Sequence, residues 1–364
     1  MKIKEIIPIL EELTPLAYAE DFDNVGLLVG NNEQKITGIL VCHDALETVV
    51  EEAVEKKCNL IVCFHPILFS GLKKITGKNY VERAVIKAIK YDVSIYAIHT
   101  ALDNHPEGVN KIFCNLLGLK NTKILIPKSS YIQKLITFVP RRQAEQVKNA
   151  LFEAGAGAIG NYDNCSFVSD GMGSFRGNSQ SNPIIGVQGK YEEVEEAKVE
   201  VTFEKHLQSK VLKKLFVSHP YEEVAYEIYN LENKLQNAGM GMIGELENEM
   251  DEMEFLKMVK TKTETGGVRY SSLLGKPIKK VAVLGGSGSF AIANAKAQGA
   301  DAYLTADLKY HQFYEAEKQL VLVDVGHFES ERYTKNYIVE YLSKKMPTFA
   351  VILSTVNTNP VNYL

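Results

Sequence analysis

The sequence predicts an α/β protein built from two similar lobes, with a separate α+β unit inserted between them. Three observations lead to this prediction. Apolar strand-like runs alternate with amphipathic helical segments in both flanks of the chain, a pattern typical of βαβ units and a mainly parallel sheet. The pattern changes over residues 129–236, and the change leaves flanks of equal length at 1–128 and 237–364. Each flank contains a strand that ends in His-x-x-x-acid, which indicates an internal repeat.

The first lobe, residues 1–128, begins with "MKIKEIIPILEEL", whose apolar residues have helical spacing. Strands and helices then alternate. The predicted order is strand, helix, strand, helix, strand, at 36–45, 46–58, 59–66, 80–92 and 93–100.

The middle unit, residues 129–236, begins with a strand at 131–140 and a helix at 141–155. A loop rich in Gly, Ser and Asn is expected over 169–186, followed by a charged strand at 192–205. With the later helix and strand this is close to βαββαβ, the order of a ferredoxin-like unit. The α/β pattern resumes at 237–364, and a pseudo-two-fold pair of lobes would bring two sets of strand ends face to face.

Composition limits the choice of partners and compartment. A net charge of −4 and a pI near 6.1 argue against nucleic acid as a partner and give no reason to expect an anionic membrane. No segment reaches the roughly 20 apolar residues that a membrane span needs. Five cysteines without C-x-x-C spacing indicate free thiols in a reducing compartment. A cytoplasmic protein is therefore expected.

Candidate metal ligands stand at predicted strand ends, where open α/β sheets bind ligands. His65, His99, Asp103 and His327 lie at or just past such ends, and Glu331 follows His327 by four residues. A histidine and a carboxylate four residues apart share one helix face and can reach one ion. Mixed imidazole and carboxylate ligands suit zinc, manganese, iron or cobalt and leave positions open for water.

A purely structural alternative exists for each residue taken alone. Glu329 and Glu331 in a first helical turn interact favourably with the helix dipole. A single histidine at a strand end more often has a structural role than a ligand role. Two copies of the motif, together with His65 before Pro66, favour metal binding.

The segment "VLGGSGSFAIANA" predicts a strand, a glycine turn and a helix start. Backbone N–H groups around Gly286 and Gly288 could cradle an anion. The spacing is neither G-x-G-x-x-G nor a P-loop, so a tight turn is the alternative.

Four further polar residues could assist a site. Asp307 and His311 in "TADLKYHQF" could contact substrate or be exposed residues of a helix. Asp23 or Asn24, in the loop before the strand "GLLVG", could support a ligand from behind.

The motifs taken in order resemble those of the NIF-three-like family, also known as GTP cyclohydrolase 1 type 2 homologues. The matching stretches are "DNVGLLVG", "FHPILFSGLKKIT", "IHTALDN", "VLGGSGSF", "GADAYLTADLKYH", "GHFESE" and "STVNTNP". The middle unit, with "GMGSFRGNSQSNPIIG" and "SHPYEEVAYEIY", resembles the PII-like insert of the longer bacterial members.

The resemblance implies a site for two divalent ions in a cleft between the two similar lobes of each chain, and a homohexameric ring of chains. From the ligand types, zinc is the first choice of ion, with manganese, iron or cobalt as alternatives. It assigns the ligands to His65, Asp103, His327 and Glu331, with His99 nearby. Glu331 is the expected bridge, because a carboxylate offers two oxygens. Two ions about 3.5–4 Å apart can activate a shared water for hydrolysis.

One residue departs from the family pattern. Many members have two adjacent histidines before the proline, whereas the first of these positions here is Phe64. One ion is therefore expected to lose an imidazole and to bind more weakly, or to be completed by water.

Two functions follow from these expectations. The first is a metal-dependent hydrolase of a small phosphorylated or nucleotide-like substrate. The alternative is a non-catalytic metal-binding ring scaffold, whose PII-like insert senses a ligand.

Overall fold

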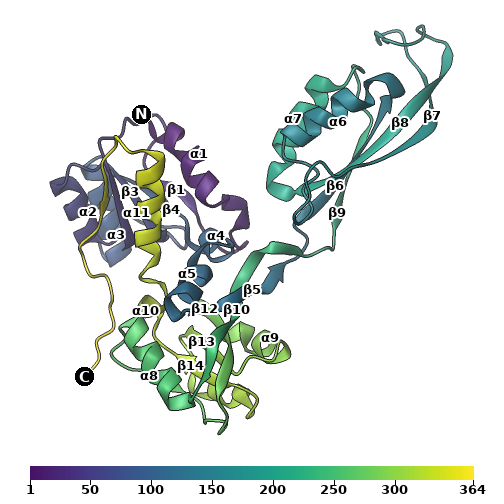
Figure 1. The fold of residues 1–364 in the computed structure, drawn as a ribbon. Coiled ribbons are helices and arrows are strands. Elements are labelled where there is room, and N and C mark those ends of the chain that lie inside the picture. Colours follow the sequence, from purple (N-terminus) through teal and green to yellow (C-terminus); the bar gives the residue numbers. More distant parts are fainter. The chain divides into compact units, whose positions relative to one another are not determined.

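The structure is a computed structural model that describes the whole chain, Met1–Leu364. It divides into two compact units (Figure 1). The larger combines Met1–Pro127 with Asn237–Leu364, and the smaller is Lys128–Gln236. Helices and several sheets occur in the chain, which confirms the predicted mixed α/β class.

The first sheet of the larger unit has the order β1-β4-β3-β2-β15. Its strands are β1 (Gly26–Val29), β2 (Ile39–Asp44), β3 (Leu60–His65), β4 (Ser94–Ala97) and β15 (Val351–Leu353). All neighbours are parallel except β1 and β4. Helices cover both faces: α1 (Ile3–Leu13) and α11 (Thr334–Lys345) on one, α2 (Glu47–Glu55) and α3 (Tyr80–Lys90) on the other. Because both faces are covered, the central strands are continuous apolar runs.

The second sheet has the order β11-β14-β13-β12-β10-β5. Its strands are β5 (Lys120–Lys128), β10 (Leu235–Met250), β11 (Arg269–Tyr270), β12 (Ile278–Ser287), β13 (Ala302–Ala306) and β14 (Val321–Asp324). Helices α5 (Val109–Leu117) and α8 (Glu252–Thr263) pack on one face, and α9 (Ile292–Ala297) on the other. Two short helices, α4 (His99–Asp103) and α10 (His327–Glu331), follow β4 and β14.

The two sheets exchange an edge strand between the flanks of the chain. β15 lies near the carboxyl terminus, yet it pairs with β2, with Ile352 opposite Leu40. Conversely, β5 belongs to the amino-terminal flank and lies beside β10 in the second sheet. The predicted division at 1–128 and 237–364 therefore does not separate the two sheets.

The smaller unit has a four-stranded antiparallel sheet of order β7-β8-β6-β9. Its elements are β6 (Ile132–Pro140), α6 (Ala144–Glu153), β7 (Phe167–Arg176), β8 (Tyr191–Glu204), α7 (Gln208–Ser218) and β9 (Tyr226–Leu231). This is the βαββαβ order and strand arrangement of a ferredoxin-like unit. The loop predicted over 169–186 is wrong for its first half, which belongs to β7. No β7 side chain is fully buried, so no apolar alternation marks the strand.

Short 3₁₀ helices complete the chain: η1 (Leu16–Tyr18), η2 (Arg141–Gln143), η3 (Lys205–Leu207), η4 (Ser289–Ala291) and η5 (Tyr310–Ala316). All five cysteines are free thiols, as their spacing predicts. No helix has the length and apolar character needed to cross a bilayer.

Candidate metal centre

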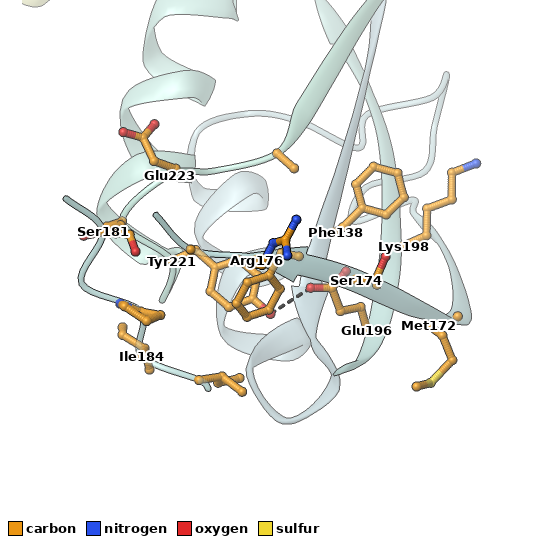
Figure 2. Close-up of a pocket in the computed structure, with 18 of the residues that line it drawn as sticks. Phe138, Met172, Ser174, Arg176, Ser181, Ile184, Glu196, Lys198, Tyr221 and Glu223 are labelled. Atoms are coloured by element: carbon orange, nitrogen blue, oxygen red, sulfur yellow. Dashed lines mark hydrogen bonds between the residues drawn. The ribbon is translucent and has the colours of Figure 1, made fainter. Parts of the chain in front are cut away.

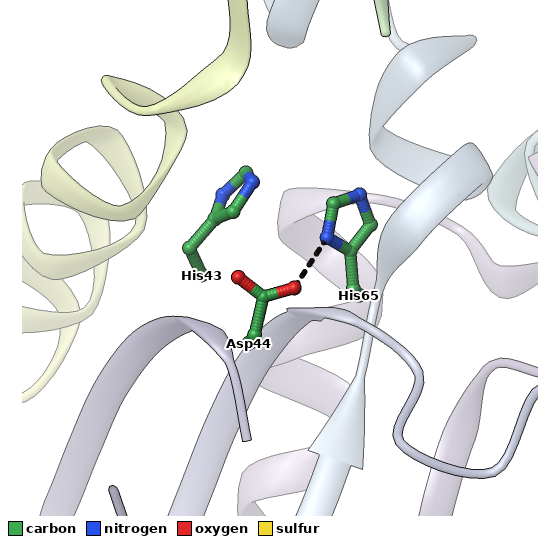
Figure 3. A group of neighbouring side chains, drawn as sticks. All are labelled: His43, Asp44 and His65. Atoms are coloured by element: carbon green, nitrogen blue, oxygen red, sulfur yellow. Dashed lines mark hydrogen bonds and ion pairs between the residues drawn. The ribbon is translucent and has the colours of Figure 1, made fainter. Parts of the chain in front are cut away.

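Three neighbouring parallel strands bring histidines to one edge of the first sheet. β2 ends with His43 and Asp44, β3 ends with His65, and His99 begins α4 two residues after the end of β4. The register pairs Asp44 with His65 across the two strands. Figure 3 shows His43, Asp44 and His65 together at these strand ends.

Helix α10 brings the other half of the site from the second sheet. As predicted, His327 and Glu331 share one helix face, with His327 Nε2 3.3 Å from Glu331 Oε2. The preceding Gly326 has φ +93°, and a Cβ there would lie 2.2 Å from Glu329 Oε2. Glu329, on the same helix, is not directed to the histidines. It accepts a hydrogen bond from Asn359 Nδ2 at 3.0 Å and so contacts the carboxyl-terminal segment.

Three imidazoles converge on one buried carboxylate oxygen. Glu331 is 4% exposed, and its Oε2 lies 3.3 Å from Nε2 of His65, 3.3 Å from Nε2 of His327 and 3.5 Å from Nε2 of His43. The His43 and His65 rings are 4.6 Å apart, and those of His65 and His327 are 5.3 Å apart. Residues far apart in the sequence thus form one compact cluster.

Three histidines each have their Nδ1 hydrogen-bonded to a different aspartate. Nδ1 of His65 lies 2.8 Å from Asp44, Nδ1 of His99 lies 2.8 Å from Asp23, and Nδ1 of His327 lies 2.7 Å from Asp307. An Nδ1–H donated to a carboxylate fixes the orientation of the ring, so that Nε2 is the nitrogen that can bind an ion once it is deprotonated. This carboxylate–imidazole arrangement is the one that orients metal-binding histidines.

The charges of the cluster shift its pKa values. Burial would lower the pKa of His65, but Asp44 and Glu331 raise it to about 9. Burial would also lower the pKa of His327, but Glu331 and Asp307 raise it to about 11. Burial would raise the pKa of Glu331, yet His327 and His65 hold it well below its usual range. Burial and the charge of Glu331 raise the pKa of Asp103 well above its usual range.

His43 differs from the other histidines of the cluster. It is 3% exposed, and neither ring nitrogen has a hydrogen-bond partner. Burial and neighbouring His65 lower its pKa to about 4, so the ring is neutral at pH 7.

The donor set fits a divalent cation. Asp103 Oδ1, Glu331 Oε2 and both nitrogens of His43 are buried without a hydrogen bond. Such atoms are costly unless a partner satisfies them. Two groups have ligand atoms that all lie within 4.8 Å of one another: His43, Asp44 and His65, and His65, His327 and Glu331. Imidazole nitrogens and carboxylate oxygens in this number are typical zinc ligands.

The predicted ligands do not all lie in these groups. His65, His327 and Glu331 come together, whereas Asp103 belongs to neither group. Asp103 is nevertheless close enough for the charges of Glu331 and His65 to act on its pKa. His99 stands beside the cluster, with its ring 5.2 Å from that of His65.

The glycine turn lies against the cluster, but the N–H groups of Gly285 and Gly286 donate to side chains of the protein. Gly286 N–H donates to Ser330 Oγ at 2.9 Å, and Gly285 N–H donates to Asn110 Oδ1 at 3.0 Å. A Cβ on Gly286 would lie 2.3 Å from Glu331 Oε1. Gly288 accepts a hydrogen bond from the Tyr303 hydroxyl at 2.7 Å. These contacts agree with the tight-turn alternative.

The four assisting residues separate into two kinds. Asp307 and Asp23 orient His327 and His99, as described above. His311 is exposed and contacts the ring of Tyr310 instead of the cluster. Asn24 donates from its side chain to the Leu68 carbonyl.

Two residues of the cluster, His43 and Asp44, are absent from the predicted set. Their signal is the His-Asp pair that ends the apolar run "ILVC". A strand end is the same criterion that identifies His65, and the two strands are parallel neighbours.

A cavity of about 510 Å³ opens onto the cluster. Its lining combines cluster residues, Arg269 and the carboxyl-terminal segment: His43, Asp44, His65, Arg269, Asp307, Asp324, Gly326, His327, Phe328, Glu329, Asn359, Pro360, Val361 and Tyr363. A volume of this size suits a small molecule.

The fold and this cluster define a class of protein. The chain matches the model of the Duf34/NIF3 (NGG1p interacting factor 3) family over residues 1–360, and it belongs to that family. The resemblance identified from the motifs is therefore confirmed.

Particular relatives match along almost the whole length. A protein of Bacillus subtilis (strain 168) named GTP cyclohydrolase 1 type 2 homolog is 39% identical, over 99% of this chain and 98% of its own. A Staphylococcus epidermidis protein of the same name is 35% identical, over 100% of both chains. The crystal structure of a Bacillus cereus protein related to NIF3 is 36% identical with a TM-score of 0.85, and it covers 100% of this chain and 99% of its own.

Proposed function

We propose that this protein is a divalent-metal-dependent hydrolase of a small phosphorylated or nucleotide-like substrate. The ligands in this proposal are His65, Asp103, His327 and Glu331. The observation that carries it is the convergence of three Nε2 atoms on the buried Oε2 of Glu331 beside a cavity of about 510 Å³. Two divalent ions bound there would supply the Lewis-acid chemistry that activates water and stabilises a hydrolytic transition state.

The protein's own residues position such a site. Asp44 and Asp307 orient His65 and His327 with their Nε2 atoms towards Glu331. Glu331 offers a second oxygen, which supports the proposal that it bridges two ions. Asp103 has a buried oxygen, Oδ1, that accepts no hydrogen bond and is proposed to bind an ion.

Arg269 supports an anionic substrate. It lines the cavity, and its side chain is 61% exposed. Both hydrogen bonds of its guanidinium group, to Asp324 and to the Leu308 carbonyl, use the nitrogen Nη2. The other guanidinium donors are directed to no protein acceptor and suit a phosphate or carboxylate oxygen.

The test is metal-dependent turnover of a panel of phosphoesters and nucleotides. GTP belongs in the panel because relatives are named GTP cyclohydrolase 1 type 2 homolog. Metal-loaded wild-type protein should turn over at least one compound, and His327→Ala and Glu331→Gln should abolish this turnover while remaining folded. His311→Ala removes an exposed histidine outside the cluster and should keep full activity. Full activity in the two cluster variants would refute the proposal.

A second candidate function rests on the smaller unit. It contains its own cavity of about 640 Å³ beside β7 and β8 (Figure 2). The lining includes Arg176, Lys198, Glu196 and Tyr221, whose hydroxyl donates to Glu196 at 2.7 Å. A ligand bound in this cavity would support the alternative proposal, a non-catalytic ring scaffold whose PII-like insert senses a ligand. Protection of residues 171–183 from hydrogen exchange by a metabolite, without any turnover, would support it.

The resemblance supports three further parts of the proposal. These are the pseudo-two-fold pair of lobes, the two-metal site between them and assembly into a homohexamer. Zinc is proposed as the resident ion from the ligand types, with manganese, iron or cobalt as alternatives, and a cytoplasmic location is proposed from the free cysteines. Mass measurement in solution tests the homohexamer, and metal analysis of native protein tests the identity of the ion.

A further inference from the structure

We propose that His43 is a metal ligand of this chain and supplies the imidazole that is missing at Phe64. This inference rests on the metal centre of the proposed function, although not on hydrolysis. It concerns a residue outside the ligand set that the resemblance implies.

The strand register places His43 and Phe64 side by side. Because Cys42 pairs with Cys63 and Asp44 with His65, the positions between them are opposite one another on β2 and β3. Side chains at opposite positions of neighbouring strands point to the same face of the sheet. The two rings stack with centroids 5.3 Å apart. The imidazole of His43 on β2 therefore lies beside the position that an imidazole at residue 64 on β3 would occupy.

The side chain of His43 makes no hydrogen bond within the protein. Its neighbours are aromatic: Phe64 on one side, Phe328 at 5.2 Å and the His65 ring at 4.6 Å. Both ring nitrogens are buried without a hydrogen bond. A buried histidine with a structural role normally satisfies at least one nitrogen through a protein partner. A partner that is not part of the protein is the simplest remaining explanation.

The position of the His43 Nε2 atom indicates that this partner is a metal ion. Nε2 of His43 lies 3.5 Å from Glu331 Oε2, the same oxygen that His65 and His327 approach. An ion in contact with Glu331 on this side would be within reach of His43 and His65 together. Unlike His65, His43 has no aspartate on Nδ1, and its ring packs against those of Phe64 and Phe328. The loss of one imidazole through Phe64 is thus compensated from the neighbouring strand.

The test compares metal binding by wild-type protein and His43→Phe, which keeps an aromatic ring in place. Equilibrium dialysis with metal analysis gives ions per chain and affinity for Zn²⁺. The visible absorption of the Co²⁺-loaded protein reports on the coordination number and ligand field of the ion, both of which change when an imidazole is lost. His43→Phe should lower the affinity for one ion at least about tenfold, since loss of even a supporting group costs that much. His311→Phe serves as the matched control and should bind as wild type.

A second pair of variants makes the test independent of packing. His43→Leu should weaken the same ion, and adding Phe64→His to it should restore the affinity and the Co²⁺ spectrum. Unchanged stoichiometry, affinity and spectrum in His43→Phe and His43→Leu would overturn the role of His43 and leave the metal centre intact. A wild-type protein that binds no ion at the cluster would instead overturn the metal centre itself, and this inference with it.

Discussion

His327 and Glu331 lie one helical turn apart on α10, with Nε2 of the histidine 3.3 Å from Oε2 of the glutamate. Helix α10 follows β14 of the second sheet, whereas its partners His43 and His65 lie on β2 and β3 of the first. The pair is therefore the point where the two halves of the candidate centre meet. Its geometry follows from a helix that begins at His327, because residues four apart lie on one helix face.

Chelation should destabilise the wild-type protein but not Glu331→Gln. An ion that binds only the folded state stabilises it by about 4 kcal/mol at a thousand times its dissociation constant. Thermal unfolding with and without a chelator measures the difference. Glu329→Gln, on the same short helix but bonded to Asn359, is the matched control and should keep the wild-type response. An equal response of Glu331→Gln and wild type would contradict the central role of Glu331.

The stability of the metal-free protein should fall as the pH rises above neutrality. His65 and His327 have folded-state pKa values of about 9 and about 11, above the ordinary value of 6.5. Their contribution is fully present below pH 6.5 and is lost as the pH rises through 9 and then 11. Urea unfolding between pH 6 and pH 10 measures it. The fall should be smaller in Glu331→Gln, and a wild-type profile that is flat or rises over this range would count against the ion-pair cluster.

Gly286→Ala should disrupt the centre without touching a ligand. The new Cβ would lie 2.3 Å from Glu331 Oε1 and 3.2 Å from His327 Nε2, at a backbone φ of +68°. Gly299→Ala separates the two effects, because Gly299 has φ +69° and open space around it. Both variants should lose about 1 kcal/mol of stability from backbone strain. Only Gly286→Ala should also lose metal binding, and normal metal content in that variant would show that the glycine does not border the site.

Asp44→Asn and Asp307→Asn should weaken metal binding without abolishing it. Each aspartate accepts the Nδ1 proton of one histidine, and such supporting groups contribute about 10–100-fold in affinity. Zinc affinity by competition with a chromophoric chelator measures the loss. Asp163→Asn, an exposed aspartate in the smaller unit, is the control. Affinities equal to wild type would indicate that these histidines do not depend on their aspartates.

The parts of the fold that could be predicted are those with a strong local pattern. The apolar runs of β2 and β3 and the periodicity of α1 to α3 are visible in the sequence because both sheet faces are covered. β7 could not be predicted, since its exposed residues show no alternation. The pairing of β15 with β2 depends on contacts between opposite ends of the chain, which no local pattern encodes.

The same distinction applies to the site. His65, His327 and Glu331 could be predicted because strand ends and helical spacing place them. The partnership of His99 with Asp23 joins residues 76 positions apart and needs the folded structure. His43 stands at a strand end and could have been predicted on that criterion. From the sequence alone, Phe64 indicates only a missing ligand. The register of β2 and β3 is needed to show that His43 and Phe64 lie side by side.

The most direct test of the account is a crystal structure of natively purified protein, with anomalous scattering recorded at metal absorption edges. The account predicts two anomalous peaks at the cluster, both in contact with Glu331, and with His43, His65, Asp103 and His327 among the ligands. A fully ordered cluster without an anomalous peak, in protein purified without chelator, would contradict it.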